Sequence, residues 1–257
     1  MTSLSADEKV LATALLESRK AGKLADPKAM PVPADAASAM RSQAETVRGL
    51  GEKVVGWKVG FTADGNPFAA PLLESVVVKA PTKWVQKPGP DFRIEIEFGV
   101  RLSKDLPPRP GKPYTLEEIT DAYDTVFCGI EMLASRYTDP AQPSFLLGLA
   151  DCMHNGGYIL GEEKKTKTIP GPLDKMTCRA TIDGKEIFNG APKHPQDDIL
   201  LPLVAYASKQ NDDLGGLKAG QIITTGALSG VLALKEGGKF VASLTGYDDM
   251  VVEFAHG

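Results

Sequence analysis

The stretch Arg93-Ile94-Glu95-Ile96-Glu97-Phe98 places polar and apolar residues in strict alternation. This alternation predicts a half-buried strand, so the side chains of Glu95 and Glu97 should point to one face. A second apolar run, 126–130, ends at Glu131, and a carboxylate at the end of a buried strand is costly unless something pairs with it. Three converging carboxylates would suit a hard divalent cation such as Mg²⁺ or Mn²⁺. The spacing by itself favours a plainer interpretation, in which Glu95 and Glu97 lie on the wet face of a strand.

The composition is that of a globular protein, with 42% hydrophobic and 24% charged residues among 257. The net charge of -4 and the absence of a Lys/Arg cluster argue against a nucleic-acid-binding protein. The apolar stretches are too short to span a bilayer, and the first residues lack the apolar core of a secretory signal. Three cysteines without metal-type spacing predict reduced thiols in a cytoplasmic protein. Three histidines are too few for a His-rich zinc site.

The chain divides into a helical beginning and a β-rich remainder. Amphipathic patterns with glycine stop signals predict helices over 5–21 and 35–51. Further helices are expected at 116–124 and 199–210, and Asp183-Gly184 predicts a hairpin turn. Short strands are expected at 54–61, 75–79, 93–102, 126–130, 157–160, 177–182, 222–225, 240–244 and 250–254. The prediction is an α+β fold with an N-terminal helical region, residues 1–52, and a β-rich body of mixed sheets, residues 53–257.

Lys58 is a candidate proton carrier. It lies in the apolar, glycine-flanked run 54–61. A lysine in apolar surroundings is costly to keep charged, so its pKa should fall, and such a lysine can move protons near neutral pH. The alternative is an ordinary lysine whose ammonium group reaches the surface.

Two glycine-rich turns carry further polar residues. Asp151-Cys152-Met153-His154-Asn155-Gly156-Gly157 follows a short apolar run and suggests a backbone turn close to a ligand. Thr225 stands at the start of a glycine loop, 224–230, whose hydroxyl and N–H groups would suit a carboxylate. The plainer alternative for the first segment is that Asp151 and Asn155 only build the turn, which is the commoner use of such residues. The second segment is equally explained as a plain connection between strands.

Six motifs, in order along nearly the whole chain, resemble the 2-keto-4-pentenoate hydratases and 4-oxalocrotonate decarboxylases of the fumarylacetoacetate hydrolase superfamily. They are Gly56-Trp57-Lys58-Val59-Gly60-Phe61-Thr62, the stretch 93–98, Glu131 with Ser135-Arg136, Ala150-Asp151 with Asn155-Gly156-Gly157, His194-Pro195, and 217–220 with Thr225-Gly226-Ala227-Leu228-Ser229-Gly230. No single motif is decisive, but six in matching order are a strong signal.

The resemblance implies a body of rolled mixed sheets and a metal-dependent hydratase that adds water to a 2-hydroxyalka-2,4-dienoate. Mg²⁺ or Mn²⁺ would be held by the residues that match the family's three acids, Glu95, Glu97 and Glu131. The residue matching the family's lysine, Lys58, would shuttle protons, and Asp151 and Thr225 would bind the small 2-oxoacid. The resemblance also implies a homo-oligomer, whereas the charge and the apolar stretches already argue against nucleic-acid and membrane partners.

The chain departs from the family pattern at two places. Relatives carry an acid in the loop that matches 66–71, where this chain has Asn66-Pro67-Phe68-Ala69-Ala70-Pro71. The family's serine after the Asp151 position is His154 here, which either takes an acid–base role, since imidazole titrates near neutral pH, or only packs and donates hydrogen bonds.

Three alternatives to the hydratase remain open. A decarboxylase of 4-oxalocrotonate-type diacids would share the metal site, since it needs only enolate stabilisation as CO₂ leaves. An acylpyruvate hydrolase would require a water activated beside a His–Glu pair, which is not evident upstream of Glu95. A non-catalytic ligand-binding protein would explain the missing loop acid but not the retained Lys58 and carboxylates.

Overall fold

The computed structural model describes residues 3–86, 92–139 and 143–256, so the extreme ends of the two predicted regions, residues 1–2 and 257, lie outside it. The helices are α1 Ala6–Ala21, α2 Ala36–Leu50, α3 Leu116–Ala122, α4 Phe145–Ala150 and α5 Leu201–Ser208. The strands are β1 Val54–Phe61, β2 Pro67–Leu73, β3 Val77–Lys79, β4 Thr82–Gln86, β5 Phe92–Leu102, β6 Tyr123–Leu133, β7 Asn155–Lys165, β8 Cys178–Ile182, β9 Lys185–Gly190, β10 Ile222–Ala227, β11 Leu232–Leu234, β12 Gly238–Leu244 and β13 Met250–His256.

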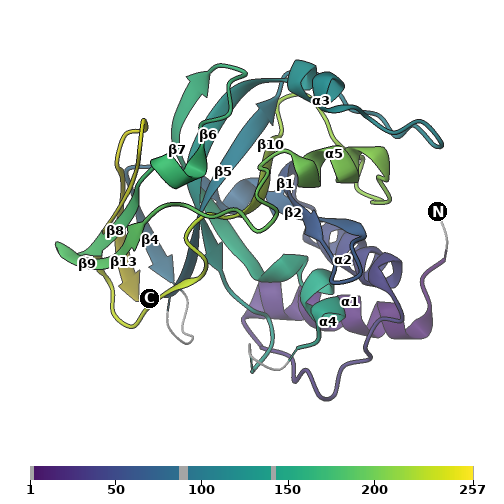
Figure 1. Cartoon of the computed structure of the whole chain (residues 1–257). Helices are drawn as coiled ribbons and strands as arrows, with labels where there is room; N and C mark the ends of the chain where they lie inside the picture. Colours follow the sequence, from purple (N-terminus) through teal and green to yellow (C-terminus); the bar gives the residue numbers. More distant parts are fainter. Residues whose placement is uncertain (1–2, 87–91, 140–142, 257) are drawn as a thin grey trace.

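Two mixed sheets form the body, as the α+β prediction requires. The larger has the order β2-β1-β10-β5-β6-β7-β3, with β11 also paired to β5, and the smaller has the order β4-β13-β12-β8-β9. The pairs β1–β10, β3–β7 and β13–β4 are parallel, whereas the other pairs are antiparallel. Figure 1 shows the smaller sheet at one side of the molecule and α1, α2 and α4 gathered at the other. β10 lies between β1, to which it is parallel, and β5, to which it is antiparallel, so it joins the early and middle parts of the chain.

The N-terminal helices begin and end where the sequence predicts. Ser5 caps α1 in a capping box with Glu8, and Asp35 caps α2 through the Ser38 amide. Gly22 and Gly51 end them in the left-handed conformation that favours glycine. The helices do not have a separate core, because their apolar faces share one buried cluster with the β-rich body. The boundary near residue 52 therefore stays a prediction about domain organisation.

The segment 66–71, taken from the sequence as a loop, is largely a strand. β2 is buried along its whole length and pairs antiparallel with β1. Its two prolines hid the strand, but β2 is an edge strand of the larger sheet, where a proline is tolerated because it need not donate to a neighbour. The short apolar run before Asp151 forms helix α4, which the sequence pattern does not predict. Ser144 caps the first turn of this helix.

Other element boundaries move by a few residues. The helix expected to reach residue 124 ends at Ala122, and β6 takes Tyr123 onward. The strand expected at 75–79 is a 3₁₀ turn, Glu74–Val76, followed by the short β3. β4 and β11 were not predicted. The Asp183-Gly184 hairpin is confirmed, with both residues at positive φ between β8 and β9.

Glycines make room for aromatic rings on the face of the larger sheet that carries Glu97. Gly99 lies two residues further along β5, on the same face. A Cβ at Gly99 would lie 2.3 Å from the ring of Phe127 and 2.5 Å from the carbonyl oxygen of Ile223. A Cβ at Gly129 would lie 2.3 Å from the ring of Tyr158. The rings of neighbouring strands thus cover glycine positions and fill the space beneath the site.

We predict that Gly99→Ala lowers the free energy of unfolding by about 1–3 kcal/mol, the usual cost of overpacking a rigid core. The added methyl group meets backbone as well as a buried ring, so neither neighbour can move away cheaply. Gly190→Ala is the control, because a Cβ there meets nothing within 4 Å. Denaturant unfolding measures both; equal stability of the two variants would contradict the packing role.

Candidate metal centre

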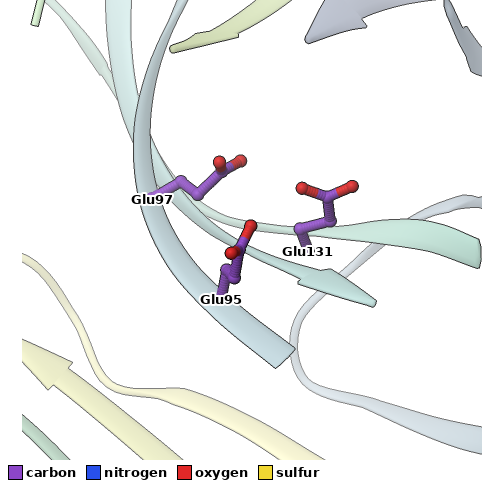
Figure 2. Close-up of side chains that lie close together, drawn as sticks. All are labelled: Glu95, Glu97 and Glu131. Carbon is purple, nitrogen blue, oxygen red and sulfur yellow. The ribbon is translucent and has the colours of Figure 1, made fainter. Parts of the chain in front are cut away.

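The register between β5 and β6 brings the three predicted ligands together. Glu95 stands directly opposite Glu131, and Glu97 stands opposite Gly129. Because opposite residues share a face and alternate residues repeat it, all three carboxylates project from the same side of the sheet. Each offers an oxygen within 4.8 Å of the others, and Figure 2 shows the groups converging. Glu97 and Glu131 are buried, whereas Glu95 is partly exposed.

Lys58 reaches this cluster from β1. Its Nζ lies 2.6 Å from Oε1 of Glu131, with only 13% of the lysine side chain exposed. The same ammonium donates a longer, 3.4 Å hydrogen bond to the carbonyl of Met153. The strand carrying Lys58 is joined by β10 to β5, and β5 pairs with β6, so these four adjacent strands hold the lysine and the carboxylates in fixed relation. This burial excludes the alternative in which the ammonium group of Lys58 reaches the surface.

The concentration of negative charge changes the ionisation of the site. Burial, helped by the charge of Glu95, raises the pKa of Glu131 to about 7, although Lys58 acts in the opposite direction. Burial and the charge of Glu131 raise the pKa of Glu97 well above its ordinary value. Desolvation alone would lower the pKa of Lys58, but Glu131, Glu95 and Glu97 outweigh it and raise this pKa. The predicted fall in the pKa of Lys58 is therefore wrong for the metal-free protein, because the sequence argument counted burial but not the neighbouring charges.

The donor set fits a hard divalent cation. Carboxylate oxygens are the ligands that Mg²⁺ and Mn²⁺ prefer, and the buried Oε2 of Glu131 has no hydrogen-bond partner in the described part of the chain. Three carboxylates this close repel one another, and one lysine does not balance them. A divalent cation would supply the missing positive charge and a partner for the unpaired oxygen.

Two further residues orient the carboxylates. The hydroxyl of Thr224 on β10 donates to Oε2 of Glu97 at 2.5 Å, and the side-chain amide of Asn155 donates to Oε1 of Glu131 at 2.8 Å. Both are buried. Both residues lie in segments that the sequence singles out, 224–230 and 151–157, but the glutamates that they contact lie on other strands, so no local signal predicts this role.

Asp151 lies in a buried ion-pair cluster next to this site. Arg136 donates to Asp151 through its backbone amide at 3.0 Å and through Nε, and Nη2 of Arg19 on α1 lies 3.8 Å from the carboxylate. Burial alone would raise the pKa of Asp151, but Arg136, His154 and Arg19 outweigh it, and the pKa lies below its ordinary value. Nη1 of Arg136 also donates to the carbonyl of Asn155 at 2.8 Å. The cluster thus fixes the backbone from which Asn155 reaches Glu131.

His154 ends a turn of unusual backbone. Cys152, Met153 and His154 all have φ between 52° and 60°, a region that costs non-glycine residues about 1–3 kcal/mol each. Nδ1 of His154 lies 3.3 Å from Oδ2 of Asp151, and a Cβ at Gly148 of α4 would lie 2.8 Å from Nε2. No hydrogen bond joins this imidazole to the three glutamates in the ranges that the structure describes. The turn instead brings the carbonyl of Met153 to Lys58.

Thr225 lies at the end of β10, buried, with a hydroxyl that lacks a hydrogen-bond partner among the described residues. Its carbonyl accepts a 3.0 Å hydrogen bond from Nε2 of His194. Burial lowers the pKa of His194, so the neutral ring can donate from Nε2 while Nδ1 accepts from the Gln196 amide. The chain after Thr225 then runs beside β5, where the hydroxyl of Ser229 accepts from the Ile96 amide at 3.2 Å.

The comparisons with known proteins agree with this geometry. The 2-keto-4-pentenoate hydratase of Paraburkholderia xenovorans strain LB400 is 28% identical over 219 residues, covering 80% of this chain and 77% of that protein. The solved 4-oxalocrotonate decarboxylase of Pseudomonas putida G7, complexed with magnesium and adipate, is 18% identical with a TM-score of 0.74, covering 99% of this chain and 100% of that one. The fumarylacetoacetate hydrolase family protein ynq8 of yeast has a TM-score of 0.56 at 19% identity, over 78% of this chain and 92% of that one.

The chain has the fumarylacetoacetate hydrolase fold and is similar in sequence to the 2-keto-4-pentenoate hydratases. No family model matches the sequence. The resemblance predicted from six short motifs is thereby confirmed over most of the chain, and the predicted rolled, mixed-sheet fold of this superfamily is confirmed with it. None of the helices within the described ranges has the length and hydropathy needed to cross a membrane.

We predict that Glu97→Gln makes the metal-free protein more stable at pH 8. Since the folded-state pKa of Glu97 lies above its ordinary value of 4.5, the wild type loses stability as the pH rises above 4.5 and through the folded-state pKa. Glutamine retains an acceptor for Thr224 but carries no charge. The gain should be ~1 kcal/mol or more, measured by denaturant unfolding in EDTA at pH 5 and pH 8.

Glu253→Gln, at an exposed position of β13, is the matched control and should leave the pH profile unchanged. Added Mg²⁺ should raise the melting temperature of the wild type and of this control, but not that of Glu97→Gln. Identical pH profiles for wild type and Glu97→Gln would show that the three carboxylates do not strain the metal-free fold.

Proposed function

We propose that this protein is a metal-dependent hydratase that adds water to a 2-hydroxyalka-2,4-dienoate to give a 4-hydroxy-2-oxoacid. The observation that carries the proposal is the convergence of three carboxylates, within 4.8 Å, beside the buried ammonium group of Lys58. The sequence relatives named 2-keto-4-pentenoate hydratase support the choice of reaction. The uncharged Phe68 and Ala70 of β2, beside Lys58 on β1, support a substrate with a hydrocarbon tail.

Glu95, Glu97 and Glu131 are the proposed ligands of Mg²⁺ or Mn²⁺. The bound cation would supply Lewis acidity to the carboxylate and 2-oxo groups of the substrate. Thr224 and Asn155 would keep Glu97 and Glu131 aimed at it, through the hydrogen bonds that they already donate. The solved decarboxylase with magnesium supports the choice of a hard cation.

Lys58 is the proposed proton carrier. In the overall reaction the 2-hydroxyl group of the dienol loses a proton and C5 gains one, which leaves a 2-oxo-3-enoate. Water then adds at C4 and a proton is delivered to C3. Nζ of Lys58 lies at the edge of the carboxylate cluster with little exposure to solvent, so it is placed to take and return these protons next to the substrate.

The remaining predicted residues receive supporting roles in this proposal. The unpartnered hydroxyl of Thr225 would donate to the substrate carboxylate. Asp151 would act on the substrate through the turn that it anchors, since its own oxygens are engaged by Arg136. The acid–base role predicted for His154 is secondary to that of Lys58, because its Nδ1 is engaged with Asp151. A homo-oligomer also remains part of the proposal.

A decarboxylase of 4-oxalocrotonate-type diacids is the second candidate. It is favoured by the solved decarboxylase whose whole chain matches almost all of this one. Its reaction needs the same cation and carboxylates but no water addition. The two functions therefore differ in product, and not in the ligands that the protein offers.

We expect that EDTA abolishes turnover of 2-hydroxypenta-2,4-dienoate and that Mg²⁺ or Mn²⁺ restores it. Turnover is measured by the loss of the dienol absorbance and by detection of the 4-hydroxy-2-oxo product. CO₂ release from 2-oxohex-3-enedioate, without hydration of the dienoate, would replace the hydratase by the decarboxylase. Turnover that is insensitive to EDTA would contradict both.

We expect that Lys58→Met lowers kcat about 10²- to 10⁴-fold, as loss of a general acid–base group does, while Mg²⁺ binding persists. Methionine fills similar volume without a proton to exchange. Lys53→Met is the control, because that lysine is 71% exposed and pairs only with Glu74 in the residues described. An unchanged kcat for Lys58→Met would remove Lys58 from the mechanism.

A further inference from the structure

Tyr158 is the buried polar residue of this site that the mechanism above does not use. It lies on β7 directly opposite Glu131, so its side chain shares the face of the sheet that carries the carboxylates. Its relative exposure is 0%, and its hydroxyl has no hydrogen-bond partner in the described part of the protein.

The ring of Tyr158 extends from β7 across β6. A Cβ at Gly129 would lie 2.3 Å from Cε1 of the ring and 2.6 Å from the hydroxyl oxygen. Gly129 is itself the register partner of Glu97 on β5. The hydroxyl therefore points across the glycine toward Glu97, with Glu131 beside it. An alanine at 129 would close this path, so glycine there is what allows the tyrosine to reach the acidic cluster.

The rest of the surroundings are apolar. The ring packs edge-on against Phe127 at a centroid distance of 6.2 Å, within a small buried cluster that includes Leu72, Leu160 and Ile222. A phenylalanine would fill this space equally well. A buried hydroxyl that makes no hydrogen bond is unfavourable, and such groups in folded proteins usually have a partner. Packing alone thus does not account for a tyrosine here.

Among the described residues, the same site contains a second atom without a hydrogen-bond partner, Oε2 of Glu131. An unpaired donor, the Tyr158 hydroxyl, and an unpaired acceptor, which belongs to one of the three carboxylates that fit a divalent cation, therefore lie on one face. Partners of metal-binding carboxylates commonly hold those ligands in place and raise metal affinity.

We propose that Tyr158 is a positioning residue of the metal centre, whose hydroxyl donates a hydrogen bond to the Glu97–Glu131 carboxylate pair in the cation-loaded protein. The tyrosine does not touch the cation or the substrate; it fixes the direction in which the carboxylates present their oxygens. The inference rests on the metal site of the proposed function, but not on which reaction the enzyme catalyses.

The test is Mg²⁺ and Mn²⁺ binding to the Tyr158→Phe protein without substrate, measured by calorimetry and by the metal-induced shift in melting temperature. Phenylalanine keeps the ring over Gly129 and removes only the hydroxyl. The expected result is a metal affinity about 10- to 100-fold weaker than that of the wild type, with the metal-free melting temperature unchanged or raised.

Tyr123→Phe is the matched control. Tyr123 is equally buried, on β6, but its hydroxyl donates to the carbonyl of Lys167 at 2.8 Å. Loss of this hydrogen bond in Tyr123→Phe should lower the melting temperature and leave the metal affinity unchanged. A loss of metal affinity in Tyr123→Phe as large as that in Tyr158→Phe would overturn the specific role of Tyr158, because both losses would then follow from general stability.

The outcomes separate this inference from the proposed function. A wild-type protein that binds neither cation would overturn the metal site itself. Wild-type binding with equal affinity in Tyr158→Phe would overturn only the role of Tyr158. A Tyr158→Phe protein that is destabilised without metal would also overturn it, because the hydroxyl would then serve the metal-free fold.

Discussion

Repulsion among three carboxylates held by one strand register is the constraint on which the site depends. The β5–β6 pairing fixes Glu95 opposite Glu131, and the pleat adds Glu97 to the same face. Burial removes the water that would otherwise screen these charges. The surrounding groups reduce this repulsion: Lys58 supplies one positive charge, and Thr224 and Asn155 donate hydrogen bonds to individual oxygens. What they leave uncompensated is the charge that a divalent cation brings.

The shape of the sheet serves the same end. Large rings lie over Gly99 and Gly129, so the face of the sheet that carries the carboxylates is filled there, although those two positions have no side chains of their own. A second layer of charge, Asp151 with Arg136 and Arg19, lies behind the turn at 152–154 and keeps that strained backbone in place. The three carboxylates are thus supported by the packed rings and by an ion-pair cluster beside the turn.

The sequence predicted the parts of this arrangement that follow from local pattern. Strand alternation placed Glu95 and Glu97 on one face, and capping residues placed α1 and α2. It missed β2, because prolines are read as breakers when the edge position of a strand is not known. It also gave Lys58 the wrong direction of pKa shift, because the charges acting on that lysine come from strands about 37 and 73 residues away. Long-range pairing decides such electrostatics, and a local pattern does not contain it.

The position of β10 has a consequence for the order of assembly. β1 and β5 are not neighbours in the sheet; β10, made more than 100 residues after both, lies between them. During synthesis the lysine strand and the glutamate strands therefore exist for a long interval without the strand that joins them, and such distant pairings form late because the intervening loop must first close. A growing chain has its acidic ligands before it has the frame that brings them to Lys58. The arrangement that sets Lys58 beside the three carboxylates is thereby completed only in chains that have nearly finished folding.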